Sequence, residues 1–191
     1  MNLLEHSVCG SSFWRGLTQR YLLPWLLRDV TLGDHLLELG AGYGAATSHL
    51  RPRVLRLTSI DHDHRSVLTL KSRTNGLSET LCADVTRLPF ASQTFSSALA
   101  ILVAHHLKST QVQDHMFCEA FRVLRPSGTF VMFEIHNDWI HRIGHIRSTF
   151  TPLDSQTVQS RLTTAGFTNI VVDARTGGFK VLARRPANEC P

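Results

Sequence analysis

The residues best suited to chemistry begin with three glycines at alternate positions. Gly40, Gly42 and Gly44 directly follow a short apolar run. Glycine lets the main chain bend sharply, and it lets a ligand touch the backbone because no side chain intervenes. Gly40, Gly42 and Ala45 match the dinucleotide fingerprint, and Asp61 lies near the position of its ribose-binding acid. The pattern therefore predicts a cofactor site, with a nicotinamide cofactor as one candidate and a tight turn without a ligand as the other reading.

A second group of reactive side chains consists of histidines further along the chain. His105 and His106 are adjacent, and His136 follows a later apolar run. Histidine titrates near neutral pH, so each of the three could accept a proton from a substrate. The alternative is that one of the adjacent pair is structural and that the other packs beside a ligand.

The chain has few features of a metal or disulfide protein. Its four cysteines are scattered, no two have the spacing of zinc ligands, and a disulfide framework is not expected in a chain of this size. We therefore expect no metal site and a cytoplasmic location. The amino terminus lacks the basic start and apolar block of a secretory signal.

Length and composition are those of one globular domain. The 191 residues are 42% apolar and carry a formal net charge of +5. They are enough to bury a core, and no apolar run is long enough to span a membrane. The basic balance comes without aromatic residues interleaved among the charges, so nucleic-acid binding is not expected. We expect a single domain over residues 1–191, as a monomer or a homodimer.

Apolar runs alternate with helical patterns along the chain, which favours an α/β fold with a parallel sheet. After the first apolar run, strands are expected at 54–60, 80–83, 95–102 and 129–135, and a hairpin at 169–174 and 179–184. Helices are expected at 13–28, from the end of the glycine stretch to about residue 50, and at 66–72, 111–124 and 155–165. Residues 1–30 are expected to form a helical cap. Residues 136–152 form a long connection of the kind that often covers a site, so we expect a lid over the acceptor.

Five stretches follow one another in an order that is more specific than any one of them. They are Glu38-Leu39-Gly40-Ala41-Gly42-Tyr43-Gly44, Thr58-Ser59-Ile60-Asp61, Cys82-Ala83-Asp84-Val85 (with Leu88-Pro89-Phe90), Val103-Ala104-His105-His106-Leu107, and Phe121-Arg122-Val123-Leu124-Arg125-Pro126-Ser127-Gly128. The set resembles the motifs of the class I S-adenosylmethionine-dependent methyltransferases from about His35 to Ala183. Two positions depart from that family: Ser96 replaces an acid, and Ser127 replaces a glycine.

The resemblance implies a doubly wound, seven-stranded, mostly parallel sheet. It would have helices on both faces, a carboxyl-terminal antiparallel hairpin and S-adenosylmethionine as cofactor. Gly40, Ala41, Gly42 and Gly44 would approach the methionine and ribose portions. Glu38 would hold the methionine ammonium directly or through water, unless it is a buried acid that only supports the glycine loop.

The resemblance also implies roles for residues at the next strand ends. Asp61 would accept both ribose hydroxyls, because a carboxylate offers two acceptor oxygens. His62 would lie near the adenine, Asp84 would accept its amino group, and the Val85 amide would meet a ring nitrogen. Ile101 completes the expected cofactor-binding set. The alternative for Asp61 is a residue that only caps the strand end or forms a turn, and the alternative for Asp84 is a loop acid without a ligand.

The implied reaction is methyl transfer to a small-molecule acceptor by in-line displacement. His106, His105 and His136 are the candidate bases, with His141 on the lid as a further candidate. Apolar residues 101–103 stand where related metal-dependent enzymes carry an acid, so no metal is expected. Two alternatives stay open: a nicotinamide-dependent oxidoreductase, and a cofactor-binding module without catalysis.

Overall fold

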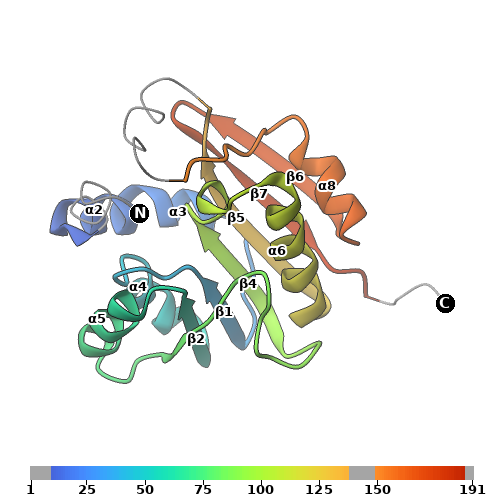
Figure 1. Ribbon diagram of the computed structural model, residues 1–191. Helices are drawn as coiled ribbons and strands as arrows, with labels where there is room; N and C mark the ends of the chain where they lie inside the picture. The colour runs from blue at the N-terminus through green and yellow to red at the C-terminus, as the bar shows by residue number, and fades with distance from the viewer. Residues whose placement is uncertain (1–9, 138–148, 188–191) are drawn as a thin grey trace.

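The chain folds around one seven-stranded sheet, described here from a computed structural model that covers residues 10–137 and 149–187. The strand order is β3-β2-β1-β4-β5-β7-β6 (Figure 1). All neighbours pair in parallel except β7, which is antiparallel to both β5 and β6. The bounds are β1 His35–Leu39, β2 Arg56–Asp61, β3 Glu79–Cys82, β4 Phe95–Ile101, β5 Leu124–Ile135, β6 Thr168–Arg175 and β7 Gly178–Arg184. This is the expected sheet, including its terminal hairpin.

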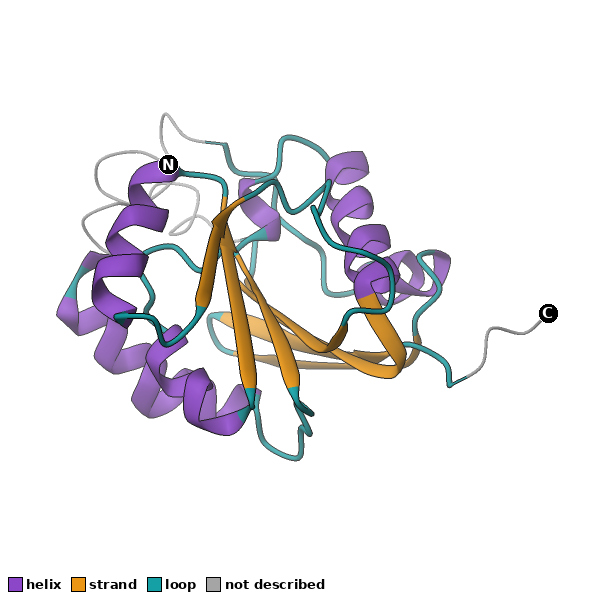
Figure 2. Ribbon diagram, turned by 90° about the horizontal axis from the view of Figure 1, so that it is seen from below, coloured by secondary structure: helices purple, strands orange, loops and turns teal. Residues whose placement is uncertain are grey.

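Helices cover both faces of the sheet (Figure 2). They are α2 Ser12–Leu17, α3 Leu23–Leu26, α4 Thr47–Leu50, α5 His64–Thr74, α6 Thr110–Val123 and α8 Val158–Thr164, with the π-helical η1 Thr18–Leu22 and the 3-10 turns η2 Arg51–Arg53 and η3 Ala104–His106. Alternate strand residues face opposite sides, so the central strands supply two apolar cores. Leu37 and Met132 pack in the core that contains α6 and α8, whereas Leu36 and Val131 pack in the core that contains α3 and α4.

The central strands are apolar on both faces, as strands covered by helices must be. All five residues of β1 are buried. Polar side chains that mark helix starts lie where expected from their chemistry: Asp63 accepts amide hydrogen bonds at the start of α5, and Ser109 does so at the start of α6. α5 ends at Asn75, which adopts the left-handed conformation at φ 45°.

The amino-terminal segment is helical as expected, and contacts at two points join it to the rest of the domain. The indole Nε1 of Trp25 donates to Asp173 at 3.0 Å, and the Arg175 guanidinium lies 4.7 Å from the Trp25 ring. Gln19 donates to the Ala45 carbonyl and to Ser48, both at 3.1 Å. The segment is therefore joined to β6 at one point and to the residues after the glycine loop at another.

The start of β5 differs from the sequence-based expectation. The residues from Pro126 to Gly128 were expected to separate the preceding helix from a strand that begins at Thr129, but β5 begins at Leu124. Leu124 pairs with Phe95, and a register shift then accommodates the turn residues within the strand. Ser127 adopts φ 63° there. The chain thus passes directly from α6 into β5.

Among residues 10–137 and 149–187, no helix combines the length and the apolar character that crossing a bilayer would require. The domain boundary at 1–191 and the lid over 136–152 stay predictions, because residues 138–148 lie outside the described part.

Candidate functional site

The glycine loop follows β1 at the carboxyl edge of the sheet, which is the edge where doubly wound folds bind ligands. Gly40, Gly42 and Gly44 have φ of 63°, 53° and 80°, values that side chains disfavour. A Cβ on Gly40 would meet Val103 at 2.6 Å, and one on Gly44 would meet Leu70 at 2.6 Å. A Cβ on Gly42 would meet nothing within 4 Å. Two glycines therefore permit packing, and Gly42 leaves its backbone open to a ligand.

Asp61, the last residue of β2, faces this loop. Its carboxylate accepts hydrogen bonds from the Gly42 amide at 2.8 Å and from the Asp63 amide at 2.9 Å. The side chain of Asp61 is mostly buried. The side chain of the next residue, His62, is 75% exposed, and its Nδ1 lies 3.5 Å from Asp61 Oδ1. A carboxylate has about four acceptor positions, so two remain for ribose hydroxyls. The structure thus joins Asp61 to the Gly42 amide, while the side chain of His62 is mostly exposed.

Glu38, near the end of β1 and just before the same loop, is buried. Its Oε2 accepts the Thr47 hydroxyl at 2.8 Å and the Ser59 hydroxyl at 2.7 Å. Burial raises the pKa of Glu38 to about 7, although the two hydroxyl bonds act in the opposite direction. This carboxyl can therefore change its charge near neutral pH, which suits a group next to a cationic ligand. Ala41, between Gly40 and Gly42, donates its amide hydrogen to the Ile60 carbonyl at 2.9 Å.

Asp84 and Val85 follow β3 and are joined to the Asp61 region by the backbone. The Ala83 amide donates to the Asp61 carbonyl at 3.0 Å. Asp84 Oδ1 accepts the amide and the hydroxyl of Thr86, each at 2.8 Å. Asp84 is exposed and Val85 is buried. The side chain of Asp84 is thus fixed by a turn and remains open to solvent on its other oxygen.

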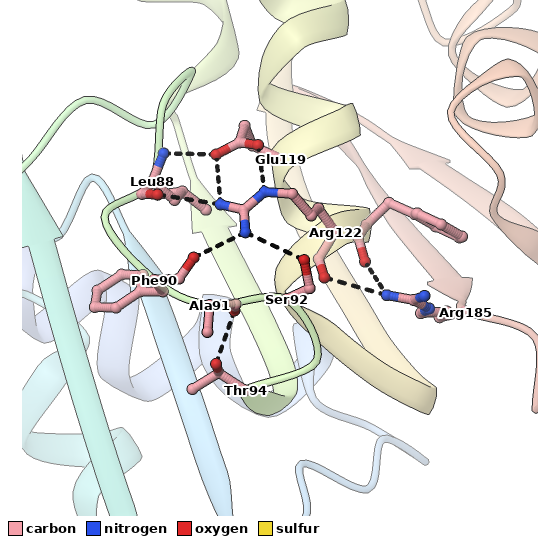
Figure 3. A network of polar contacts seen from close by, with 9 residues as sticks. Leu88, Phe90, Ala91, Ser92, Thr94, Glu119, Arg122 and Arg185 are labelled. Carbon is pink, nitrogen blue, oxygen red and sulfur yellow. Dashed lines mark hydrogen bonds and ion pairs between the residues drawn. The ribbon is translucent and has the colours of Figure 1, made fainter.

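The loop after Asp84 is held by an ion pair on α6 (Figure 3). Arg122 donates to Glu119 at 2.6 Å and to the carbonyls of Phe90 and Leu88 at 2.8 and 3.1 Å. Glu119 in turn accepts the Leu88 amide at 2.7 Å, and its hydrogen bond with Arg122 lowers the pKa of Glu119. The Leu88-Pro89-Phe90 stretch therefore has a structural partner, which the sequence did not reveal.

The end of β4 is organised around a buried acid on β5. Glu134 accepts the amides of Val103 and Ala104 at 2.9 and 2.6 Å through Oε1, and its Oε2 lies 2.6 Å from His105 Nδ1. Both Glu134 and His105 are almost completely buried. Val103 in turn packs against Gly40. Glu134 thus fixes the turn that contacts the glycine loop.

The three candidate bases occupy different surroundings. His105 is buried against Glu134, and the His106 ring lies 4.0 Å from it in a partly exposed position. His136 Nε2 lies 2.9 Å from the Arg175 carbonyl, so that ring contacts the hairpin. His106 and His136 are thus both partly exposed, whereas His105 is buried. His141 lies outside the described residues.

The structure brings together Glu38, the glycine loop and Asp61, with Ile101 partly exposed at the end of β4. Thr47, Ser59 and Glu134 were not among the predicted site residues. An acid inside an otherwise apolar run is the one signal that could have identified Glu134. In the part of the chain that the structure describes, no group of three or more His, Cys, Asp or Glu side chains is arranged for a metal ion. Metal independence stays a prediction.

Comparison with known proteins gives one family. The family model described as "Methyltransferase domain" matches residues 37–132. The chain is 28% identical over 114 residues to 24-methylenesterol C-methyltransferase 2 of Arabidopsis thaliana, covering 56% of the chain and 31% of the relative. It is 29% identical over 107 residues to demethylmenaquinone methyltransferase of Tropheryma whipplei, covering 55% of the chain and 43% of the relative. The chain thus spans less than half the length of these two relatives.

Solved structures share the fold at low sequence identity. A Pyrococcus horikoshii protein has a TM-score of 0.78 at 17% identity and covers 92% of each chain. The N-methyltransferase NodS of Bradyrhizobium japonicum, in complex with S-adenosylhomocysteine, has a TM-score of 0.73 at 22% identity and covers 97% of this chain and 93% of its own.

Proposed function

Because the chain belongs to the class I S-adenosylmethionine-dependent methyltransferases, we propose that it transfers the methyl group of S-adenosylmethionine to a small-molecule acceptor. The observation that supports this most is the hydrogen bond of 2.8 Å from the Gly42 amide to the Asp61 carboxylate, at a glycine where an added Cβ would meet no atom within 4 Å. Glu38, at the end of the preceding strand, is buried. Two groups of that cofactor find a partner here. The ribose hydroxyls meet an acceptor, and the methionine ammonium meets a buried acid, while the glycine backbone leaves room for both portions.

The residues present fit this cofactor. Asp61 would accept the ribose hydroxyls, and Glu38 would face the methionine ammonium, whose positive charge favours the ionised carboxyl. Asp84 and the Val85 amide would meet the adenine, with His62 at the rim. Ile101 would supply an apolar contact from β4. When bound, the cofactor supplies an electrophilic methyl group on a sulfonium.

The contribution of the protein to such a reaction is mainly alignment and exclusion of water, because charge is dispersed in the transition state. His106 would accept a proton from an acceptor that must lose one. The Glu134–His105 pair would hold the turn that carries His106 and would not itself touch the substrate. Acceptors that arrive already ionised would need no base.

The acceptor is proposed as a small molecule on the strength of the relatives. Two of these are methyltransferases named for a sterol and a demethylated menaquinone, which are apolar ring compounds. A small apolar acceptor methylated at carbon is therefore our first choice. A cytoplasmic location and a monomeric or homodimeric state stay predictions.

The experiment is methyl transfer from S-adenosylmethionine with a tritiated methyl group to a panel of quinols, sterols, phenols and amines. We expect labelled product from at least one acceptor, and its loss in Asp61→Ala. Asp154→Ala, which changes an exposed acid before α8, is the matched control and should keep activity. Tight binding of S-adenosylhomocysteine without transfer to any acceptor would instead indicate a cofactor-binding module without catalysis.

A further inference from the structure

The amino-terminal helical segment exposes large apolar side chains at a spacing of four residues. Phe13 is 79% exposed, Leu17 40% and Tyr21 64%. Residues 12–26 are helical throughout, and side chains four apart lie on one face of a helix. Phe13 and Leu17 lie on α2, and Tyr21 lies on the π-helical η1 that continues it; these three residues are called the apolar stripe below. α2 lies at the outer edge of the molecule (Figure 1).

The apolar stripe is exposed although the helical segment that carries it is packed against the rest of the domain. Thr18, Leu23 and Leu26 of the same segment are buried, so the segment already packs its inner side. Gln19 bonds the Ala45 carbonyl and Trp25 bonds Asp173, which fix the segment at two points. An apolar face that stays outward on an anchored helix is typical of an interaction surface.

The charge of this segment indicates what kind of partner the surface fits. Residues 10–28 contain Arg15, Arg20 and Arg28 and no aspartate or glutamate, in a chain whose net charge is +5. Arg20 and Arg28 are exposed. Helices that lie in the interface of a bilayer typically combine apolar and aromatic side chains on one face with arginines or lysines. The arginines of such helices are attracted to anionic headgroups.

We propose that the apolar stripe docks this protein on the surface of an anionic lipid bilayer, with the helix parallel to the membrane. Phe13, Leu17 and Tyr21 enter the boundary between headgroups and acyl chains, and the arginines contact lipid phosphates. Gln19 places the helix against Ala45 and Ser48, next to the glycine loop. Docking would therefore bring the crevice close to acceptors dissolved in the bilayer, and this last step alone rests on the proposed function.

The test is co-sedimentation with sucrose-loaded vesicles of phosphatidylcholine alone or with phosphatidylglycerol. The wild-type protein should bind the anionic vesicles, bind the neutral ones much less, and be released by salt. Phe13→Ser/Tyr21→Ser should weaken binding by about tenfold or more, because two apolar side chains no longer enter the lipid. Leu77→Ser/Val171→Ser removes two other exposed apolar side chains and should leave binding unchanged.

Each outcome decides the proposal. Failure to bind either vesicle, or equal binding by Phe13→Ser/Tyr21→Ser, would overturn it. A dimer in sedimentation velocity that Phe13→Ser/Tyr21→Ser dissociates would assign the stripe to a second copy of the chain and would also overturn it. Titration of each variant with S-adenosylhomocysteine separates this result from the proposed function. Cofactor binding without vesicle binding contradicts only the docking surface, and vesicle binding without cofactor binding contradicts only the enzyme.

Discussion

Glu38 is predicted to make the stability of the free protein fall as the pH rises from 5 to 8. Its pKa in the folded protein is about 7, against 4.5 for the unperturbed group. Between these values the folded state binds the proton more strongly than the unfolded state, so unfolding releases it and stability decreases with pH. One pKa unit corresponds to about 1.36 kcal/mol, so the full effect is on the order of 3 kcal/mol.

The change Glu38→Gln should remove this effect and keep the local structure. Thr47 and Ser59 both donate to the same oxygen, Oε2, and the amide oxygen of glutamine can accept both. We expect urea unfolding to show that wild-type protein loses about 2.5 kcal/mol more than Glu38→Gln between pH 5 and pH 8. Comparison between the two proteins cancels the contributions of other titrating groups.

Glu79→Gln is a suitable control, because Glu79 is an exposed acid on the edge strand β3. It should show the wild-type pH dependence. If Glu38→Gln and wild type lose stability in parallel from pH 5 to 8, then Glu38 titrates as an ordinary acid. Burial would then not control the charge of Glu38.

Three further predictions concern the crevice. Asp61→Ala should weaken binding of S-adenosylhomocysteine by about 2–3 kcal/mol in calorimetry, since charged acceptors for two hydroxyls are lost; unchanged affinity would reject the ribose role. Glu134→Ala should lower the free energy of unfolding by about 3 kcal/mol or more in urea, because three buried donors lose their acceptor; a loss below about 1 kcal/mol would show that solvent replaces it. His106→Ala should reduce turnover about 100-fold or more while cofactor affinity is kept; a normal rate would make His106 structural.

Much of the fold could be predicted from local sequence. The apolar runs of β1, β4 and β5 are buried on both faces, so their composition identifies them as central strands. The glycines of the loop could be recognised because each has a backbone conformation that other residues avoid. Gly177, at φ 92°, lies in the turn between β6 and β7.

The contacts that could not be predicted are those between distant parts of the chain, because they depend on which strands become neighbours. Glu134 meets the turn after β4 only because β5 lies beside β4, and nothing local to either strand specifies this pair. The contact between Trp25 and Asp173 joins residues 148 positions apart. His105 looked as accessible as His106 in the sequence, and only its burial against Glu134 distinguishes the two.

The central claim is that the glycine loop and Asp61 form a crevice-edge site, at the carboxyl ends of the strands, that binds S-adenosylmethionine, and calorimetric titration tests it most directly. S-adenosylhomocysteine should bind wild-type protein with a stoichiometry of about one, as a single crevice requires, and NAD should give no heat of binding. Binding of NAD with no binding of S-adenosylhomocysteine would contradict the account, because the crevice would then hold a dinucleotide and the protein could not be a methyltransferase of this kind.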